Sequence, residues 1–175
     1  IEADAFAFLA NNPVAPDGKV LFHADHANKI SAGTPTVTLF DAGRQKMAQQ
    51  KDVSGNDYLD LRPAIWLGTV ADGGAARVVN AAEYDPDTAN KLQRPNMVRG
   101  MLSDIIDSPR VADATWYLLA SPGEAPVIEV AFLEGEDQPF IDQQDGFTVD
   151  GTRYKVRLDF GIGCVDHRGI VQSAA

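Results

Sequence analysis

The sequence predicts an α+β fold in which a few helices accompany a mixed, mostly antiparallel sheet. Apolar residues recur at helical spacing in the first half of the chain, whereas from Val98 onward the apolar pattern changes to a period of two. An Asp150-Gly151 pair, which favours a tight hairpin turn, lies in this second half. Helices that come early and strands that come late are typical of α+β proteins. No linker divides the chain, so we expect a single region over residues 1–175.

Three helices are expected before the change of period. The first covers Asp4–Asn12 and ends before a proline. Thr34-Pro35 is a start signal for the second helix, with Thr34 as the N-cap and Pro35 in the first turn. This helix runs to about Gln50 and carries three apolar residues on one side: Val37, Phe40 and Met47. Asp72 is the expected N-cap of the third helix, in which four residues follow the spacing of one buried face: Ala75, Val78, Val79 and Ala82.

The strand candidates are short and are spread over the chain. Two pieces, Leu59–Leu61 and Ala64–Leu67, flank a bend at Pro63. The other candidates are apolar segments bounded by turn residues: Val20–Phe22, Arg99–Ser108, Trp116–Leu119 and Val127–Leu133. Tyr84–Asn96 is rich in proline, aspartate and asparagine, which predicts a long exposed loop.

The clearest local pattern covers Phe147–Phe160. Its second strand alternates a mostly apolar face with a charged face: Thr152, Tyr154, Val156, Leu158 and Phe160 against Arg153, Lys155, Arg157 and Asp159. A two-residue turn at Asp150-Gly151 pairs Val149 with Thr152. The same register places Phe147 opposite Tyr154. We therefore expect a hairpin with this pairing.

Composition and charge exclude several classes of protein. A chain of 175 residues that is 45% hydrophobic can bury a core without disulfides, and its only cysteine, Cys164, has no intramolecular partner. Fifteen Lys+Arg against 25 Asp+Glu give a net charge of −10, which opposes tight binding to nucleic acids or anionic membranes. The longest apolar stretches, Ala64–Ala71 and Val127–Leu133, are far shorter than the roughly 20 residues of a membrane-spanning helix.

Two polar clusters hold all three histidines and the only cysteine. His23, Asp25 and His26 follow a predicted strand, while Cys164 and His167 lie near the end of the chain. Such nitrogen, oxygen and sulfur ligands bind zinc when three or four of them converge tetrahedrally. Neither spacing matches an established zinc motif, and turn hydrogen bonds account for the histidines more simply. A small metal-dependent hydrolase that uses His23, Asp25, His26 and His167 is the alternative function.

Three other motifs give little support for a catalytic or binding site. Cys164 and His167 lie three residues apart, so on an extended strand they point to opposite faces and do not form a nucleophile–base pair. Gly161-Ile162-Gly163 follows a strand but opens no helix, which argues against a dinucleotide site. An acidic turn lacks the spacing of a calcium loop: Glu134, Glu136 and Asp137. We therefore expect no enzyme, no cofactor, and no catalytic, cofactor-binding or metal-ligating residue.

Several segments resemble, in the same order, parts of the tailed-phage major capsid proteins. Val20–Asn28 is similar to a leucine-phenylalanine segment that ends in histidine, a small residue and asparagine. That segment is typical of the branch found in Mu-like prophages and in prohead protease–capsid fusions. The resemblance continues over residues 5–170 through these segments: Gln45–Asp52 with Gly55, Leu59–Leu67, Ala75–Ala82, Ser108–Arg110, Thr115–Ala120, Val127–Leu133, Gly146-Phe147, Tyr154–Gly163 and Asp166–Gly169.

The resemblance implies the Hong Kong 97-like shell fold, which has a peripheral and an axial domain. This chain corresponds to its C-terminal portion, without the N-terminal arm and extended loop, and a start at Ile1 instead of Met fits a trimmed product. In the family the histidine-containing segment is a turn and binds no metal.

The same resemblance implies a structural role in the virion capsid of a phage or prophage. Copies would join as hexamers and pentamers that enclose DNA without reading its sequence. A prohead protease or a scaffold is the expected partner during assembly in the bacterial host cytoplasm, and no membrane is involved.

Overall fold

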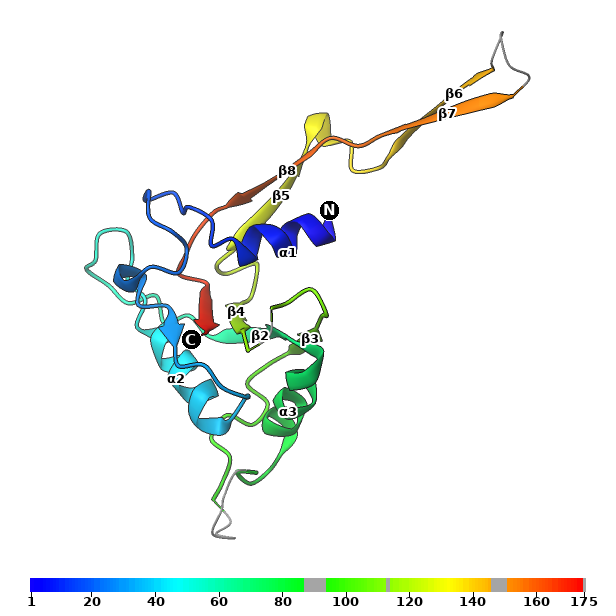
Figure 1. Ribbon diagram of the computed structural model, residues 1–175. Coiled ribbons are helices and arrows are strands. Elements are labelled where there is room, and N and C mark those ends of the chain that lie inside the picture. The colour runs from blue at the N-terminus through cyan, green and yellow to red at the C-terminus, as the bar shows by residue number, and fades with distance from the viewer. Residues whose placement is uncertain (87–93, 113, 146–150, 175) are drawn as a thin grey trace.

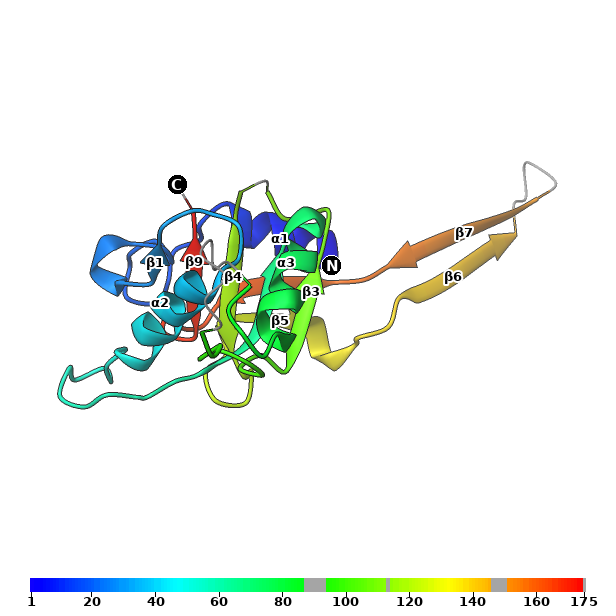
Figure 2. The ribbon, with the colours of Figure 1, turned by 90° about the horizontal axis from the view of Figure 1, so that it is seen from below.

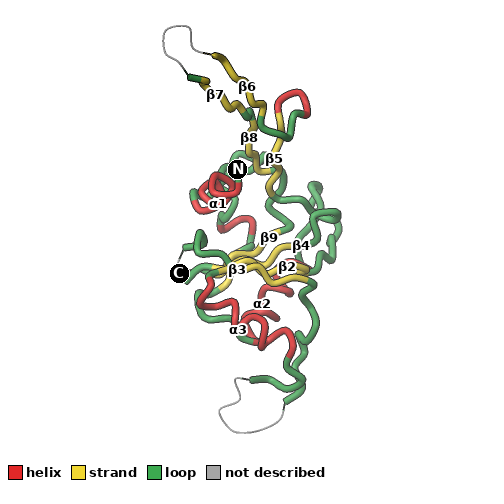
Figure 3. Tube along the Cα trace, turned by 90° about the vertical axis from the view of Figure 1, so that its right-hand side faces the viewer, coloured by secondary structure: helices red, strands yellow, loops and turns green. Residues whose placement is uncertain are grey.

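A five-stranded mixed sheet forms the centre of the computed structural model, which describes residues 1–86, 94–112, 114–145 and 151–174 (Figure 1). The strands lie in the order β1-β9-β4-β2-β3: β1 (Lys29–Ile30), β9 (Ile170–Ser173), β4 (Trp116–Ala120), β2 (Pro63–Gly68) and β3 (Asp104–Asp107). Helices α2 (Val37–Ala48) and α3 (Val70–Ala81) lie on one side of the sheet, and α1 (Glu2–Ala10) lies on the other (Figure 3).

The strand pairing confirms a mixed, mostly antiparallel architecture. Strand β4 runs antiparallel to both of its neighbours, β2 and β9. The outer pairs β1–β9 and β2–β3 are parallel. Two further antiparallel pairs, β5–β8 and β6–β7, lie outside the central sheet and form the extension described below. The expected α+β class is therefore correct.

Two hydrophobic cores lie on the two faces of the sheet, and β4 contributes to both. Trp116 and Leu118 point into the core beneath α2 and α3, while Tyr117 between them points into the core near α1. This division follows from the alternation of side chains along a strand. In the first core Phe40 packs edge to face against Trp116, with ring centroids 5.7 Å apart.

Helix α2 confirms the predicted buried face but begins at a different cap. Val37, Phe40 and Met47 are buried as expected. The N-cap is Thr36, whose hydroxyl accepts the Leu39 N–H at 3.2 Å, so the prediction of a cap at Thr34 is wrong. An N-cap side chain accepts the N–H two or three residues further on, and Thr36 does so from an extended backbone conformation.

Helix α3 differs from its prediction in both cap and buried face. Its N-cap is Thr69, whose hydroxyl accepts the Asp72 N–H at 3.2 Å, while Asp72 itself lies in the first turn. Its buried residues are Gly73, Ala76 and Val79, so Val79 is the one member of the predicted face that is buried. Val78, which the sequence pattern placed on the buried face, is 53% exposed.

Helix α1 is confirmed, but the predicted strand at Val20–Phe22 is wrong. Leu21 and Phe22 are buried in the second core without joining a sheet. The Phe22 N–H is taken by the Asn12 side chain at 2.7 Å, so it is not available to a strand partner. The chain then enters a short 3₁₀ helix, η1 (Ala24–His26).

Of two further strand predictions, one is wrong and the other is too long. Leu59–Leu61 forms no strand because Asp60 has a left-handed backbone with φ +46°. Arg99–Ser108 is extended only from Asp104, since Gly100 has φ +65° and places a turn after Val98. Part of the loop expected at Tyr84–Asn96, residues 87–93, lies outside the described residues.

Candidate interaction surface and polar cluster

A long antiparallel extension, here called the arm, projects from the central sheet (Figures 1 and 2). Its base is the pair β5 (Ile128–Phe132) and β8 (Phe160–Cys164), and its outer part is the pair β6 (Phe140–Asp145) and β7 (Thr152–Arg157). The two pairs follow one another along a single projection and are separated by the turn η2 (Leu133–Gly135). The sequence pattern predicted β5 and β7, whereas β6 was not predicted and β8 begins only at the end of the predicted strand.

The register of the outer pair differs from the prediction. Tyr154 lies opposite Gln143, and Thr152 lies opposite Asp145. The predicted partners Phe147 and Val149 fall within residues 146–150, which lie outside the described residues. Since six residues separate Asp145 from Thr152, the connection is longer than the two-residue turn that the Asp150-Gly151 pair predicted.

The outer pair has one apolar and one charged face. Residues directly opposite each other in an antiparallel pair share a face, so Ile141 and Val156 lie together and Tyr154 follows on the same side. These three side chains are 65%, 65% and 70% exposed, respectively. The other face carries Phe140, Asp142 and Gln144 from β6 and three basic residues from β7: Arg153, Lys155 and Arg157. The Arg157 guanidinium lies 5.7 Å from the centroid of the Phe140 ring.

The outer pair β6–β7 is not expected to be stable on its own. An isolated two-stranded hairpin is at best marginally stable in water, because it has no core on which to place its apolar face. The exposed face of Ile141, Tyr154 and Val156 provides apolar area for a contact with another molecule. The outer arm is therefore the candidate interaction surface.

The base of the arm is partly buried and holds the only cysteine. Val130 pairs with Ile162 on the half-buried side, and Ile128 pairs there with Cys164. Burial raises the pKa of the Cys164 thiol, and the nearby Asp166 carboxylate raises it further. The cysteine therefore lies in a packed environment that disfavours the thiolate.

An apolar groove of about 320 Å³ lies between α1, the central sheet and the base of the arm. Its walls come from all three parts: Phe6, Leu9, Ile65, Leu119, Val127 and Ile128. The walls offer few polar atoms and no set of convergent polar groups, which a small-molecule site normally has. The groove therefore does not have the features of a catalytic site.

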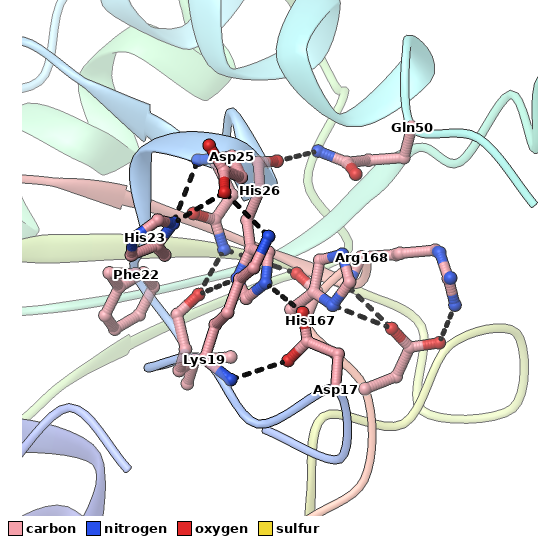
Figure 4. A network of polar contacts seen from close by, with 12 residues as sticks. Asp17, Lys19, Phe22, His23, Asp25, His26, Gln50, His167 and Arg168 are labelled. Atoms are coloured by element: carbon pink, nitrogen blue, oxygen red, sulfur yellow. Dashed lines mark hydrogen bonds and ion pairs between the residues drawn. The ribbon is translucent and has the colours of Figure 1, made fainter. Parts of the chain in front are cut away.

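A separate polar cluster joins the first loop to the end of the chain (Figure 4). His26 is 5% exposed, and its Nδ1 lies 2.9 Å from the Leu21 carbonyl oxygen. Its Nε2 lies 2.8 Å from Oδ2 of Asp17. The ring of His167 stacks on His26 with centroids 3.8 Å apart and an angle of 11° between the planes.

The charges in this cluster depend on one another. The hydrogen bonds from His26 and from the Lys19 N–H lower the pKa of Asp17 to about 2, so its carboxyl group is ionised at neutral pH. Burial lowers the pKa of His167, and the neighbouring His26 lowers it further. His167 is therefore expected to be neutral at physiological pH.

The structure separates the residues of the predicted hydrolase site. His26 and His167 come together, but the Nδ1 of His23 accepts the Asp25 N–H at 3.1 Å. The Asp25 carboxylate pairs with Lys19 at 2.6 Å, and among the described residues neither His23 nor Asp25 joins the group of converging ligand atoms. Sequence reasoning missed Asp17, because its Pro-Asp-Gly context reads as a turn. No spacing in the sequence could have linked it to His167.

A comparison with protein families identifies the chain. The profile of a family described as phage capsid protein matches residues 1–173. The chain belongs to the phage capsid protein family. No curated protein and no solved structure matches this phage capsid protein.

Family membership gives the phage capsid protein a structural role in the phage head. It places the protein in the virion capsid and implies that many copies assemble, while the α+β architecture is compatible with a phage capsid fold. The alternative function as a hydrolase is not supported. Within the ranges that the structure describes, each helix is too short or too polar to cross a bilayer.

Proposed function

We propose that this chain is the C-terminal shell-forming region of a Hong Kong 97-like major capsid protein from the Mu-like prophage branch. The family match over residues 1–173 supports a capsid role along nearly the whole chain. The finer assignment draws on the ordered segments that resemble this branch, several of which form the core of the fold. Strand β4, which contributes side chains to both hydrophobic cores, corresponds to one such segment, Thr115–Ala120.

In this proposal, the arm joins one subunit to the next. Capsid subunits must present surfaces that are exposed in the single chain and buried in the assembly. The outer arm meets that requirement, because Ile141, Tyr154 and Val156 form an exposed apolar face on a projection that reaches away from the subunit's own cores. This exposed face is the observation that carries the proposal. The resemblance to the family did not predict a projection at this place in the chain.

The contact would be heterologous, with the arm of one subunit against a different surface of its neighbour. Contacts of this kind generate closed rings when the rotation between subunits closes. Rings of six and five copies are the hexamers and pentamers from which an icosahedral shell is built. A single repeated arm contact is therefore sufficient to explain capsomer formation.

The net charge of the chain is compatible with a shell that encloses DNA without binding it tightly. A net charge of −10 makes the average field repel phosphate, so packaged DNA would not be held tightly by the wall. The basic residues Arg153, Lys155 and Arg157 are confined to one face of β7 in the described part of the arm. We propose that this charged face contacts acidic surface of a neighbouring subunit, and that a prohead protease or scaffold acts during assembly in the host cytoplasm.

Negative-stain electron microscopy of the full-length gene product tests the proposal. The expected result is shells, rings or sheets of regular capsomers. A uniform monomer at every salt and protein concentration would contradict a self-assembling role. Charge reversal by Arg153→Glu tests the charged face, since normal shells from that variant would show that the face makes no contact.

A further inference from the structure

We propose that Asp17, His26 and His167 form a binding site for a transition-metal dication such as Zn²⁺. This inference is independent of the capsid role. The three residues each offer one ligand atom, and these atoms lie within 4.8 Å of one another. Two imidazoles and a carboxylate are ligands that zinc, cobalt and nickel ions prefer, whereas magnesium and calcium prefer oxygen ligands alone.

The hydrogen bonds of His26 present one nitrogen to the site. A carbonyl oxygen only accepts, so His26 Nδ1 must donate its proton to the Leu21 carbonyl at 2.9 Å. The Nε2 atom then faces Oδ2 of Asp17 at 2.8 Å. In neutral His26 both of these facing atoms are acceptors, so the space between them must hold either a proton or a cation. A metal-ligating histidine commonly donates its other N–H to a backbone carbonyl in this way.

His167 supplies the third ligand after a change of side-chain rotation. In tetrahedral zinc sites with bonds of about 2.0–2.1 Å, ligand atoms lie about 3.3 Å apart. The 2.8 Å separation of the Asp17 and His26 atoms is close to that value. The stacked rings of His26 and His167 are nearly parallel, so His167 must turn out of the stack to direct a lone pair at the same ion. A polar cavity of about 320 Å³ borders both histidines and gives an ion and a water ligand access.

The backbone around the site is already held in place. The buried Asn28 side chain donates to the Leu21 carbonyl at 2.9 Å and to the His167 carbonyl at 3.4 Å. Gln50 donates to the His26 carbonyl at 2.9 Å. These bonds position both histidine backbones before an ion arrives, which reduces the free-energy cost of forming the site.

The charges around the cavity are of both signs. Asp25 and Asp52 line it together with three basic residues: Lys46, Lys51 and Arg168. The Arg168 guanidinium, next to His167, is paired with Asp166 at 2.8 Å, and the Lys51 ammonium lies over the Tyr58 ring. Lys19 is likewise paired with Asp25 at 2.6 Å. Two neutral imidazoles and one carboxylate leave a net charge of +1 on the bound dication, in a chain whose net charge is −10.

Binding would connect the first loop to the segment that enters β9. Asp17 and His26 precede the sheet, whereas His167 lies directly before its strand β9. An ion that binds the folded chain and not the unfolded chain stabilises the folded state by mass action. The site is therefore assigned a structural role.

Calorimetric titration of the purified, untagged wild-type chain with Zn²⁺ tests the assignment, together with the visible spectrum of added Co²⁺. We expect one ion per chain, absorption bands of tetrahedral Co²⁺, and a melting temperature that rises with Zn²⁺ and not with Mg²⁺. His167→Phe keeps a ring in the stack but removes the ligand, and should weaken Zn²⁺ binding by roughly 100-fold, as loss of even an outer-shell partner can. His23→Ala, outside the cluster, should bind as the wild type does.

Two results would overturn the assignment. One is the absence of stoichiometric Zn²⁺ binding by the wild-type chain, which would show that a proton alone fills the space between His26 and Asp17. The other is unchanged affinity in His167→Phe. If that variant does not fold, Asp17→Asn in the exposed loop provides the same test, and unchanged affinity there would equally refute the site.

Discussion

Replacing Val79 with alanine should destabilise the chain, whereas the same replacement at its neighbour Val78 should not. Both residues lie inside α3, so the change in helix propensity is the same at the two positions. They differ in burial, because Val79 is 2% exposed and packs in the core beneath the sheet while Val78 is 53% exposed. The pair therefore isolates the contribution of the buried face.

The expected magnitude follows from burial and cavity formation. Removing the two methyl groups of Val79 loses about 1.6 kcal/mol of transfer free energy, at about 0.8 kcal/mol for each carbon. The unfilled space adds roughly 1 kcal/mol at about 24 cal/mol per Å³. The better helix propensity of alanine offsets about 0.5 kcal/mol. Val79→Ala should therefore lower the free energy of unfolding by roughly 2 kcal/mol, and Val78→Ala should change it by less than about 0.5 kcal/mol.

Urea unfolding followed by tryptophan fluorescence measures both values. Trp66 and Trp116 are fully buried in the same core as Val79, so their emission reports on loss of that core. At this chain length, 2 kcal/mol corresponds to a fall in melting temperature of roughly 4–8 °C. Equal losses in the two variants, or a larger loss at Val78, would refute the orientation of α3.

Three further predictions concern single groups. Thr69→Ala removes the hydroxyl that accepts the Asp72 N–H and should lower the free energy of unfolding by about 1 kcal/mol, while Thr69→Ser should not. Equal effects of the two variants in urea unfolding would show that this cap contributes nothing. Burial raises the pKa of Cys164, so iodoacetamide should alkylate it at pH 8 about 10-fold more slowly in the folded chain than in urea, as followed by mass spectrometry. Equal rates would contradict the packing of this side chain. The pKa of Asp17 falls from 3.8 to about 2 on folding, so its stabilising effect is present above pH 3.8 and is lost as the pH falls towards 2. In EDTA, Asp17→Asn should therefore flatten the dependence of the free energy of unfolding on pH in this range. An unchanged slope would contradict the His26–Asp17 bond.

Periodic patterns predicted the parts of the fold that lie in regular elements. The continuous apolar run of β4 and the apolar stripe of α2 match the structure, because a strand buried on both faces is apolar throughout, whereas a helix buried on one face is apolar at helical spacing. The Val20–Phe22 prediction was wrong because a loop can bury Leu21 and Phe22 as well as a strand can. A periodic pattern indicates which residues are buried, but it does not indicate which groups their backbone bonds. Here the Asn12 side chain accepts the Phe22 N–H in place of a strand partner.

The candidate site depended on long-range contacts that no local pattern encodes. His26 and His167 were recognised as polar residues of interest, but their stacking results from the approach of the chain's two ends. Asp17 carries only a turn signal in the sequence. The register of the arm was also mispredicted, since the Asp150-Gly151 signal was taken to place the turn while the paired strands end at Asp145 and begin again at Thr152.

Assembly of Ile141→Asp compared with Val53→Asp tests the account most directly. Each variant replaces one exposed apolar side chain with a carboxylate, but Ile141 lies on the apolar face of the arm, whereas Val53 lies in a turn after α2, outside the arm. The two side chains are 65% and 88% exposed, so neither change should alter monomer stability by more than about 0.5 kcal/mol. Electron microscopy of the full-length gene product should show capsomers or shells for Val53→Asp and the wild type, and dispersed subunits for Ile141→Asp. Normal shells from Ile141→Asp would contradict the proposal that the arm joins neighbouring subunits.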